Sequence, residues 1–194
     1  MYIESPSPAS LVNSEFLFTD HDFAKVRTLI HRRAGIALGE QKRQMVYSRL
    51  SRRLRELRLP EFSRYLEMLE SSHDGEEWQA FINSLTTNLT SFFREAHHFP
   101  VLAEHARRSK QPVTVWCAAA STGEEPYSIA ITLVEALGER AGTARVIATD
   151  IDTAVLAKAR QASSRWSRSR ACRPSGCGAS SARHRRNAGK VRVR

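Results

Sequence analysis

Long apolar segments are absent from this sequence of 194 residues. No uninterrupted apolar run approaches the roughly 18 residues that a membrane-spanning helix needs, and the N-terminus lacks the regions of a signal peptide. Cysteine is scarce, with only 3 residues, which argues against a disulfide framework. We therefore expect a protein of the reducing cytoplasm that is not inserted into the membrane.

The sequence also lacks convincing metal ligands. Cys117 lies in an apolar segment, where cysteine is usually a small buried hydrophobic residue. Cys172 and Cys177 have no second pair of ligands nearby. His97 and His98 are adjacent, so they do not share one face of a helix. We expect no metal ion.

Acidic residues are missing from the C-terminal part of the chain. Residues 153–194 hold 12 of the 30 Lys and Arg residues and none of the 20 Asp and Glu residues. The net charge of +10 is therefore a property of this tail, and residues 1–152 are close to neutral. A nucleic acid partner is not favoured, because only the tail supports one.

The tail has no hydrophobic periodicity either. Between Ala162 and Arg186 only Trp166 is a large apolar residue, so this segment cannot form a core-facing helix or strand. It is either a disordered basic arm or the product of a shifted reading frame in a GC-rich gene, and we favour the frame shift. The final residues, Lys190–Arg194, alternate as a strand does.

Residues 19–90 show the pattern of a small helical bundle. One helix is predicted to begin at Thr19 or the next residue and to end at Gly35. A second spans about 40–58, and a third and a fourth lie on either side of a break at Ser72–Gly75. The apolar residues at helical spacing, which should form the core, are Phe23, Val26, Ile30, Ala34, Val46, Leu50, Leu54, Leu57, Phe62, Tyr65, Leu66, Leu69, Trp78, Phe81, Ile82 and Leu85.

Residues 113–152 read as strand, tight turn, helix, strand and acid. The run Val113–Trp116 enters a small-residue turn, Ala118–Gly123, and after a helical pattern the second run Val146–Ala148 leads to Asp150. This is half of a nucleotide-binding α/β domain. The turn has one glycine and not the three of a dinucleotide fingerprint, which favours a nucleoside without a pyrophosphate, such as S-adenosylmethionine.

A polar segment, Thr86–Glu95, separates the two parts. Five hydroxyl or amide side chains precede two aromatic residues and an arginine, with no helical or strand period. Loops of this type often line functional sites. A further helix, Ala96–Arg108, is predicted to follow.

The second predicted helix carries three arginines on one stripe, Arg49, Arg52 and Arg53, with few acids interleaved. Such a charge run is either a solvated face or a docking surface for an acidic partner, and the sequence favours neither.

These segments together resemble the chemotaxis receptor glutamate methyltransferases of the CheR family. The resemblance runs from about Asp20 to Gln161, and its most specific motifs are NLTSFFRE and STGEEPYS. It implies an α plus α/β fold, in which a small helical bundle precedes a Rossmann-like methyltransferase domain. It also implies S-adenosyl-L-methionine as cofactor and the glutamates on the cytoplasmic methylation helices of chemoreceptors as substrate.

The resemblance carries site roles over to matching positions. Asn88, Thr90, Arg94, Glu125 and Asp150 are the implied cofactor-binding residues, with Asp150 on the ribose. Arg94 is also the implied catalytic residue, since it would orient a carboxylate.

Each position has a structural alternative. Glu125 can close a capping box with Thr122. Asp150 can cap the next helix, although Asp152 and Thr153 could do so equally well. Arg94 can form a surface ion pair with the glutamate that follows it. Taken together, their order and spacing favour the cofactor role.

The resemblance ends after residue 161, which gives four expected segments. They are a flexible leader 1–18, a helical domain 19–90, a partial α/β domain 91–161 and an aberrant tail 162–194. We expect a fragment with only two strands of the methyltransferase sheet, an exposed strand edge at Val146–Thr149 and no catalytic activity. The alternative function is a non-catalytic, receptor-binding helical module.

Overall fold

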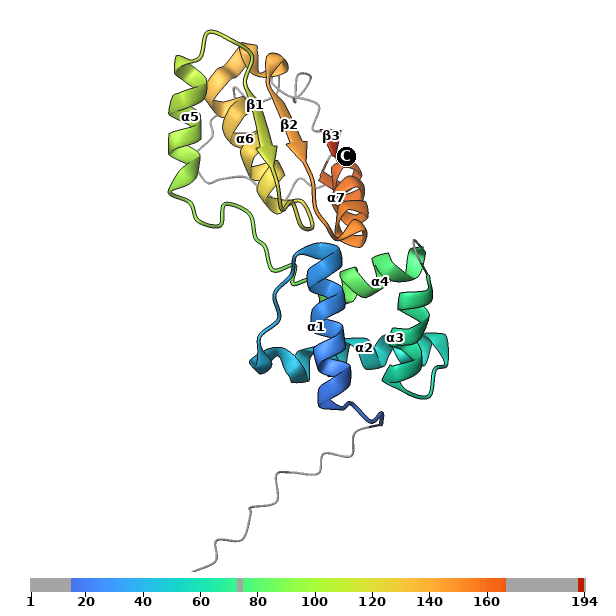
Figure 1. Cartoon of the computed structure of the whole chain (residues 1–194). Coiled ribbons are helices and arrows are strands. Elements are labelled where there is room, and N and C mark those ends of the chain that lie inside the picture. The colour runs from blue at the N-terminus through green and yellow to red at the C-terminus, as the bar shows by residue number, and fades with distance from the viewer. Residues whose placement is uncertain (1–14, 73–74, 167–191, 194) are drawn as a thin grey trace, which may run out of the picture. The chain divides into compact units, whose positions relative to one another are not determined.

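The computed structural model describes residues 15–72, 75–166 and 192–193. It divides the chain into two compact units, 1–85 and 86–194 (Figure 1). Each unit has its own hydrophobic core among the described residues. The boundary therefore lies before Thr86 and not after residue 90, where the sequence suggests it. None of the helices in the described part is both long and apolar enough to cross a lipid bilayer.

The first unit is a helical bundle whose elements match the predicted ones. Thr19 caps the first helix, because its Oγ1 accepts from the backbone N–H of Asp22 while the Asp22 carboxylate accepts from Thr19 N at 2.9 Å. Gly35, with φ of 68°, ends it. The elements are α1 (Asp20–Ala34), η1 (Glu40–Lys42), α2 (Arg43–Leu57), α3 (Phe62–Ser71) and α4 (Glu76–Leu85).

Large side chains from all four α-helices fill the core of this unit. Every predicted core residue lies in the buried cluster or packs against it. Part of the predicted leader belongs here too, because Phe16 is buried and the ring of Phe18 lies 4.4 Å from that of Phe62. The expectation of a loose leader is therefore wrong at its C-terminal end. Residues 1–14 lie outside the described part.

A charged network ties α2 to α4. The Arg53 guanidinium hydrogen-bonds both carboxylate oxygens of Glu77, with Nε at 2.8 Å from Oε1, and it also pairs with Glu56 at 2.7 Å. Tyr65 donates its hydroxyl to the same Glu77 at 2.8 Å. The hydrogen bond that Arg53 donates to Glu77 raises the pKa of Arg53, and burial raises the pKa of Tyr65. Hydrogen bonds to the Glu77 carboxylate thus join α2 and α3 to α4.

The second unit is an α/β domain with a parallel sheet of order β1-β2-β3. β1 and β2 are joined through α6 and pair in register, with Val115 opposite Val146. Figure 1 shows α5 and α6 beside these two strands. The elements are α5 (His98–Arg108), β1 (Thr114–Cys117), α6 (Glu124–Leu137), η2 (Gly138–Thr143), β2 (Arg145–Ala148), α7 (Thr153–Trp166) and β3 (Arg192–Val193).

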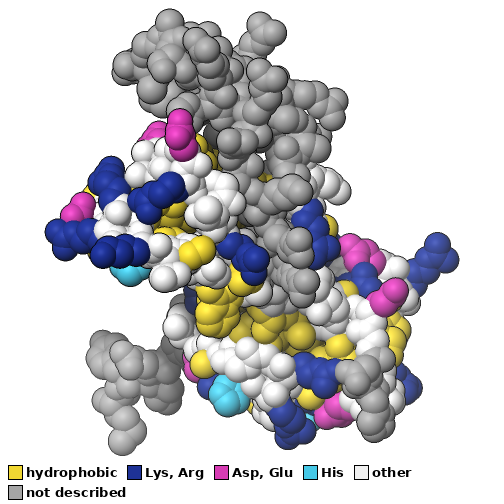
Figure 2. Space-filling view, turned by 90° about the horizontal axis from the view of Figure 1, so that it is seen from above, with side chains coloured by type: hydrophobic (Ala, Val, Ile, Leu, Met, Phe, Trp, Pro, Cys, Tyr) yellow, Lys and Arg dark blue, Asp and Glu magenta, His cyan; other side chains and the backbone are white. Residues whose placement is uncertain are grey.

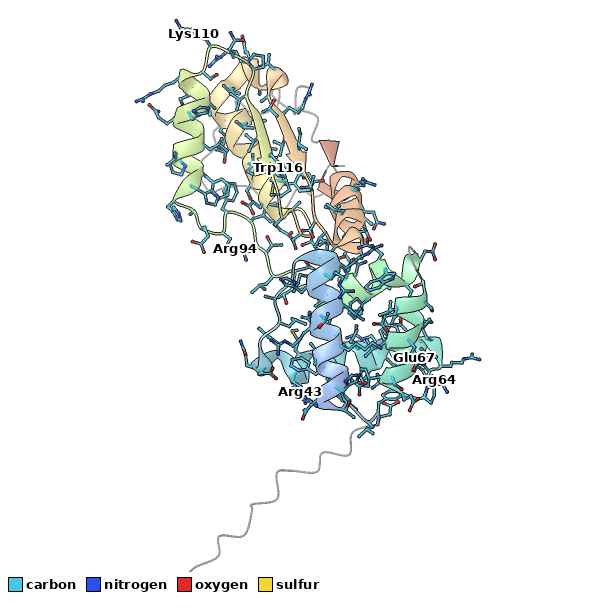
Figure 3. The ribbon with its side chains drawn as sticks, in the orientation of Figure 1. Arg43, Arg64, Glu67, Arg94, Lys110 and Trp116 are labelled. Carbon is cyan, nitrogen blue, oxygen red and sulfur yellow. The ribbon has the colours of Figure 1, made fainter. Side chains whose placement is uncertain are left out.

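The two faces of the sheet differ. Cys117, Val146 and Ala148 are buried in one cluster with Ile129 and Leu133 of α6. Alternate residues point to the other face, where Trp116 stays 69% exposed (Figure 3). The packing of α6 on one face of β1 and β2 agrees with the predicted strand–helix–strand unit.

The structure departs from the sequence predictions at the end of this unit. α5 begins at His98 and not at Ala96, and α7 continues past residue 161 to Trp166. β3 pairs with Ile147 and Ala148, so the sheet has a third strand and the expected exposed edge of β2 is partly covered. The remaining tail, with Cys172 and Cys177, lies outside the described residues.

Candidate functional site

The turns that follow β1 and β2 are joined by hydrogen bonds at the carboxyl edge of the sheet. Thr149 N donates to Cys117 O at 2.9 Å, and Ala120 N donates to Thr149 O at 2.9 Å. This edge is where parallel α/β sheets bind ligands. Ala118 and Ala119 are exposed there, and their short side chains leave the backbone open to a ligand.

Asp150 lies at this edge and is fixed by two backbone donors. Its Oδ2 accepts from Ser121 N at 2.8 Å and its Oδ1 from Asp152 N at 2.8 Å. A carboxylate has about four acceptor positions, so this half-buried group keeps acceptor capacity for hydroxyl groups. It does not cap α7, because Asp152 Oδ1 accepts from Ala154 N at 2.9 Å. The capping alternative for Asp150 is therefore wrong, and that for Asp152 is confirmed.

Glu125 lies in the first turn of α6 and is half-buried, as is Asp150 after β2. Burial, followed by the negative charges of Glu125 and Asp150, raises the pKa of the Cys117 thiol to about 11. The buried thiol confirms the prediction of a small core residue. The charges of both carboxylates thus act in the same direction on this thiol.

The first turn of α6 differs from its predicted alternative. Gly123, and not Thr122, is the N-cap residue, and Thr122 donates to Glu124 at 2.5 Å. The capping box of Thr122 with Glu125 is therefore not formed. Gly123 has φ of 107°, and a Cβ there would lie 2.9 Å from the ring of Tyr127. This turn requires glycine.

The polar segment before α5 is anchored to the same edge. Asn88 Nδ2 donates to Asp152 Oδ2 at 2.6 Å, and Thr86 Oγ1 donates to the same oxygen at 2.7 Å. The backbone oxygen of Asn88 accepts from Ser121 Oγ at 3.1 Å. Asn88 thus hydrogen-bonds Ser121 and Asp152, the two residues that donate to Asp150. The half-buried Thr90 lies further along the loop.

The rest of this loop is held in unusual backbone conformations. Phe93 has φ of 53°, and its N–H donates to the buried hydroxyl of Ser128 at 3.0 Å. Arg94 is exposed and donates to Leu89 O at 2.6 Å, closing the loop on itself (Figure 3). The predicted alternative, an ion pair with Glu95, is not formed.

Three residues of this region were missed by sequence reasoning: Ser121, Ser128 and Asp152. Each joins segments that are distant in the chain, and Ser121 adopts φ of 49° without being glycine. Of these three residues, only Asp152 is marked in the sequence, as the second aspartate after β2. The sequence predicts no role for it other than that of a helix cap.

The arginine stripe of α2 is divided by the structure. Arg52 is exposed, whereas Arg49 donates to Ser84 O at 3.4 Å and Arg53 pairs with Glu77. Glu77 of α4 therefore adds a second acid to the one that α2 itself supplies, Glu56. In Figure 2, Asp and Glu side chains lie beside Lys and Arg side chains on the face in view.

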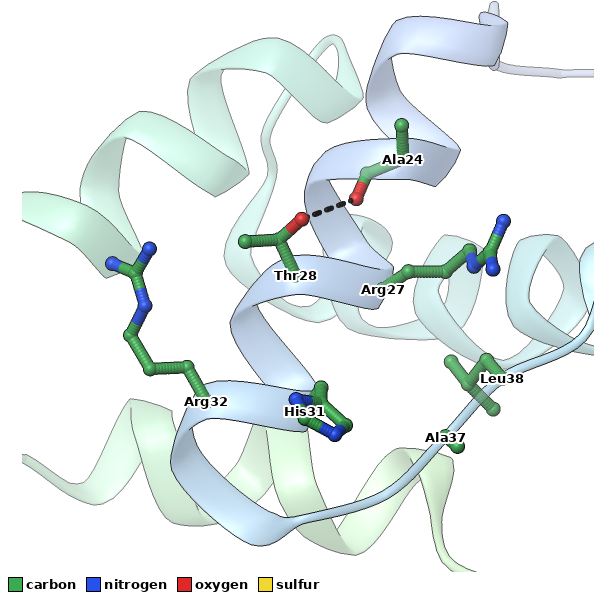
Figure 4. A pocket seen from close by; sticks show the side chains of 7 residues that line it. All are labelled: Ala24, Arg27, Thr28, His31, Arg32, Ala37 and Leu38. Carbon is green, nitrogen blue, oxygen red and sulfur yellow. Dashed lines mark hydrogen bonds between the residues drawn. The ribbon is translucent and has the colours of Figure 1, made fainter.

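A surface groove on α1 lies in the first unit (Figure 4). Its lining includes Arg27, His31 and Arg32, but Arg27 pairs with Glu40 and basic groups in a last helical turn complement the helix dipole. The groove therefore gives no independent evidence for a ligand. Within residues 15–72, 75–166 and 192–193, no cluster of His, Cys, Asp and Glu could hold a metal ion.

The second unit has the features of a nucleoside-cofactor-binding α/β domain. A fixed acid ends β2, a small-residue turn follows β1, and a polar loop is bonded to both. A nucleoside fits this arrangement, since hydroxyl groups can donate to Asp150 and the exposed turn admits a ligand close to the backbone.

Comparison with protein families agrees with this class. Residues 21–86 match the all-alpha domain of the CheR methyltransferases, and residues 88–173 match their SAM binding domain. The chain belongs to the CheR methyltransferase family. The predicted fold and family are confirmed.

Curated relatives carry the same designation. The chain is 64% identical over 142 residues to the chemotaxis protein methyltransferase of Salmonella typhimurium, covering 73% of this chain and 49% of that protein. It is 62% identical to the Escherichia coli protein over 142 residues, covering 73% and 50%. For chemotaxis protein methyltransferase 2 of Pseudomonas aeruginosa, identity is 56% over 164 residues, covering 83% and 58%. The chain thus spans about half the length of the relatives it matches.

Proposed function

We propose that this chain carries the cofactor-binding residues of an S-adenosylmethionine-dependent methyltransferase that esterifies glutamate side chains of chemoreceptors. One observation carries the proposal: the loop before α5, the turn after β1 and Asp150 are hydrogen-bonded together at one edge of the sheet. The names of the relatives support the substrate class.

Five residues would hold the cofactor in this proposal. Asp150 would accept hydrogen bonds from the ribose hydroxyls, because its backbone donors fix its orientation and leave acceptor positions open. When bound, the cofactor supplies a methyl group on a positively charged sulfur, so the protein needs no general base for a carboxylate nucleophile. The remaining contacts would come from Asn88, Thr90, Arg94 and Glu125.

Arg94 would orient a carboxylate, either that of the cofactor or that of the substrate. One guanidinium nitrogen donates a hydrogen bond to Leu89 O, and the side chain remains exposed. Its further N–H groups can then form a two-pronged, charge-assisted hydrogen bond. The chain's contribution to rate is then positioning of the reacting groups and exclusion of water.

Calorimetric titration with S-adenosylmethionine tests the cofactor proposal. Asp150→Ala should weaken binding by about 1–3 kcal/mol, because the polar partners of the carboxylate lose their acceptor. Glu139→Ala, which removes an exposed carboxylate from η2, is the matched control and should bind as the wild type does. Wild-type affinity in Asp150→Ala would remove the ribose role.

We also propose that the basic face of α2 docks the acidic methylation helices of the receptor. Arg52 can be tested cleanly because it is exposed, whereas changes at Arg49 and Arg53 also disturb contacts with α4. Arg52→Glu should weaken binding to a receptor cytoplasmic fragment at low salt, and the difference should shrink as salt rises. Equal receptor binding of the wild type and Arg52→Glu at low salt would favour the alternative that the basic face of α2 is only solvated.

The sequence further predicts that the 194-residue chain does not itself transfer methyl groups. Incubation with radiolabelled cofactor and receptor membranes tests this prediction, and no label should reach the receptor. Receptor binding without any cofactor binding would instead favour the alternative of a non-catalytic helical module.

A further inference from the structure

Asp152 makes more contacts than its role as a helix cap requires. Its side chain is buried, with 2% of the residue exposed. Oδ1 accepts from Ala154 N at 2.9 Å and from Val155 N at 3.3 Å, which satisfies the start of α7. Oδ2 accepts from Thr86 Oγ1 and Asn88 Nδ2, neither of which belongs to a helix. The second oxygen therefore serves the loop and not the cap.

The contacts of Asp152 close a ring of hydrogen bonds. Asp152 holds the Asn88 side chain, and the Asn88 backbone oxygen accepts from Ser121 Oγ. Ser121 N donates to Asp150 Oδ2. Asp152 N donates to Asp150 Oδ1, so the ring closes at Asp152, where it began. The ring thus joins the polar loop, the turn after β1 and the acid after β2.

The ring explains two features that local sequence does not. Ser121 has φ of 49°, a left-handed conformation that persists in a non-glycine residue only when its surroundings fix it. Both its N–H and its hydroxyl are held within the ring. Asp150, in turn, receives both of its donors from ring members. The backbone N–H of Asp152 therefore fixes one oxygen of the predicted ribose-binding carboxylate directly. The side chain of Asp152 acts on the other oxygen through Asn88 and Ser121.

We infer that Asp152 is a positioning residue, which assembles the cofactor site through Asn88 without touching the cofactor. The inference rests on the proposed function. The two oxygens of Asp152 have different roles, since Oδ1 starts α7 and Oδ2 orders the loop. A site assembled in advance binds more tightly, since less ordering remains for the ligand to induce.

A donor–acceptor exchange tests this inference. Asp152→Asn keeps the size and the capping oxygen, since asparagine is an equally good N-cap. Its new amide faces the Asn88 amide, donor against donor, so S-adenosylmethionine affinity should fall at least about tenfold while α7 stays folded. Adding Asn88→Asp reverses donor and acceptor and should restore the amide-exchange protection of residues 86–90, a readout that does not require residue 88 to contact the cofactor.

The outcomes distinguish the inference from the proposed function. If the wild type does not bind S-adenosylmethionine, the proposed function fails. If the wild type binds and Asp152→Asn binds equally well, or if the double variant leaves residues 86–90 no better protected from amide exchange than the single variant does, the inference alone is overturned. Rescue by the exchange supports it, because a purely structural cap would not respond to residue 88.

Thr86→Val provides a second route should Asp152→Asn unfold. This change removes one donor to Oδ2 and leaves α7 untouched. We expect a loss of affinity of about threefold to tenfold, in line with one hydrogen bond, and unchanged amide-exchange protection in α7. Unchanged affinity in a folded Thr86→Val variant would contradict the inference.

Discussion

The two units bury different kinds of side chain. Of the largest fully buried side chains among the described residues, all but Pro126 belong to the first unit. Most of the buried polar side chains lie in the second unit, where Ser121, Ser128, Thr132 and Asp152 are found, against Asp22 and Ser51 in the first. The first unit is thus held mainly by apolar packing, whereas the second combines a small-residue core with polar contacts that converge on one edge.

This difference indicates where function resides. Apolar packing is non-directional, and it stabilises a bundle without fixing individual polar groups. Hydrogen bonds are directional, and in the second unit they connect the loop, the turn and the acid after β2. The polar contacts of the second unit therefore organise the proposed site, whereas the Arg53–Glu77 pair of the first joins two helices.

The largest effect is expected from the apolar core of the first unit. Leu54→Ala removes a side chain that is 0% exposed, and we expect it to lower the free energy of unfolding by about 2–5 kcal/mol. Leu17→Ala, at a position that is 76% exposed, is the control and should have little effect. Urea denaturation followed by circular dichroism measures both. Equal stability of the two variants would contradict the assigned core.

A pH-dependent effect is expected in the second unit. Burial raises the pKa of Cys117 from 9.0 to about 11, so its stabilising contribution is complete below pH 9 and is lost as pH rises towards 11. The loss should approach about 2–3 kcal/mol above pH 11. Cys117→Ala should reduce the dependence of unfolding free energy on pH in this range. An identical pH profile in the variant would show that the thiol is not buried.

The turn before α6 should tolerate change poorly. Gly123→Ala places a Cβ against Tyr127 at φ of 107°, and we expect a cost of about 1–3 kcal/mol. Gly142→Ala serves as control, since nothing lies within 4 Å of its Cβ position. Amide exchange should show the loss in residues 113–159 and not in α1–α4. An equal loss of amide protection in both units would contradict the expectation that Gly123 affects the second unit alone.

The smallest effect is expected from a polar atom inside the first core. Ser51 Oγ is buried without a hydrogen-bond partner in the described structure. Ser51→Ala should stabilise the bundle by about 0.5–1 kcal/mol, because alanine has the higher helix propensity and no unsatisfied group. The exposed Ser48→Ala controls for propensity alone. A destabilised Ser51→Ala variant in urea denaturation would mean that the hydroxyl has a partner in solution.

Sequence reasoning succeeded where structure is local. The caps of α1 and the helical spacing of Leu50, Leu54 and Phe81 follow from short-range rules, and the strand–helix–strand pattern follows from hydrophobic runs. It failed where residues distant in the chain meet, as Asn88 and Asp152 do across 64 positions and Arg53 and Glu77 across 24. Only the folded chain shows that α4 neutralises part of the α2 stripe.

The central claim is that the second unit binds a nucleoside cofactor at the carboxyl edge of its sheet. An NMR titration of the isotopically labelled chain with S-adenosylmethionine tests it most directly. We predict that amide signals of residues 86–95, 118–125 and 150–152 shift in a saturable manner and by more than those of α1–α4. Saturating cofactor that moves no signal, or that moves mainly those of α1–α4, would contradict the account.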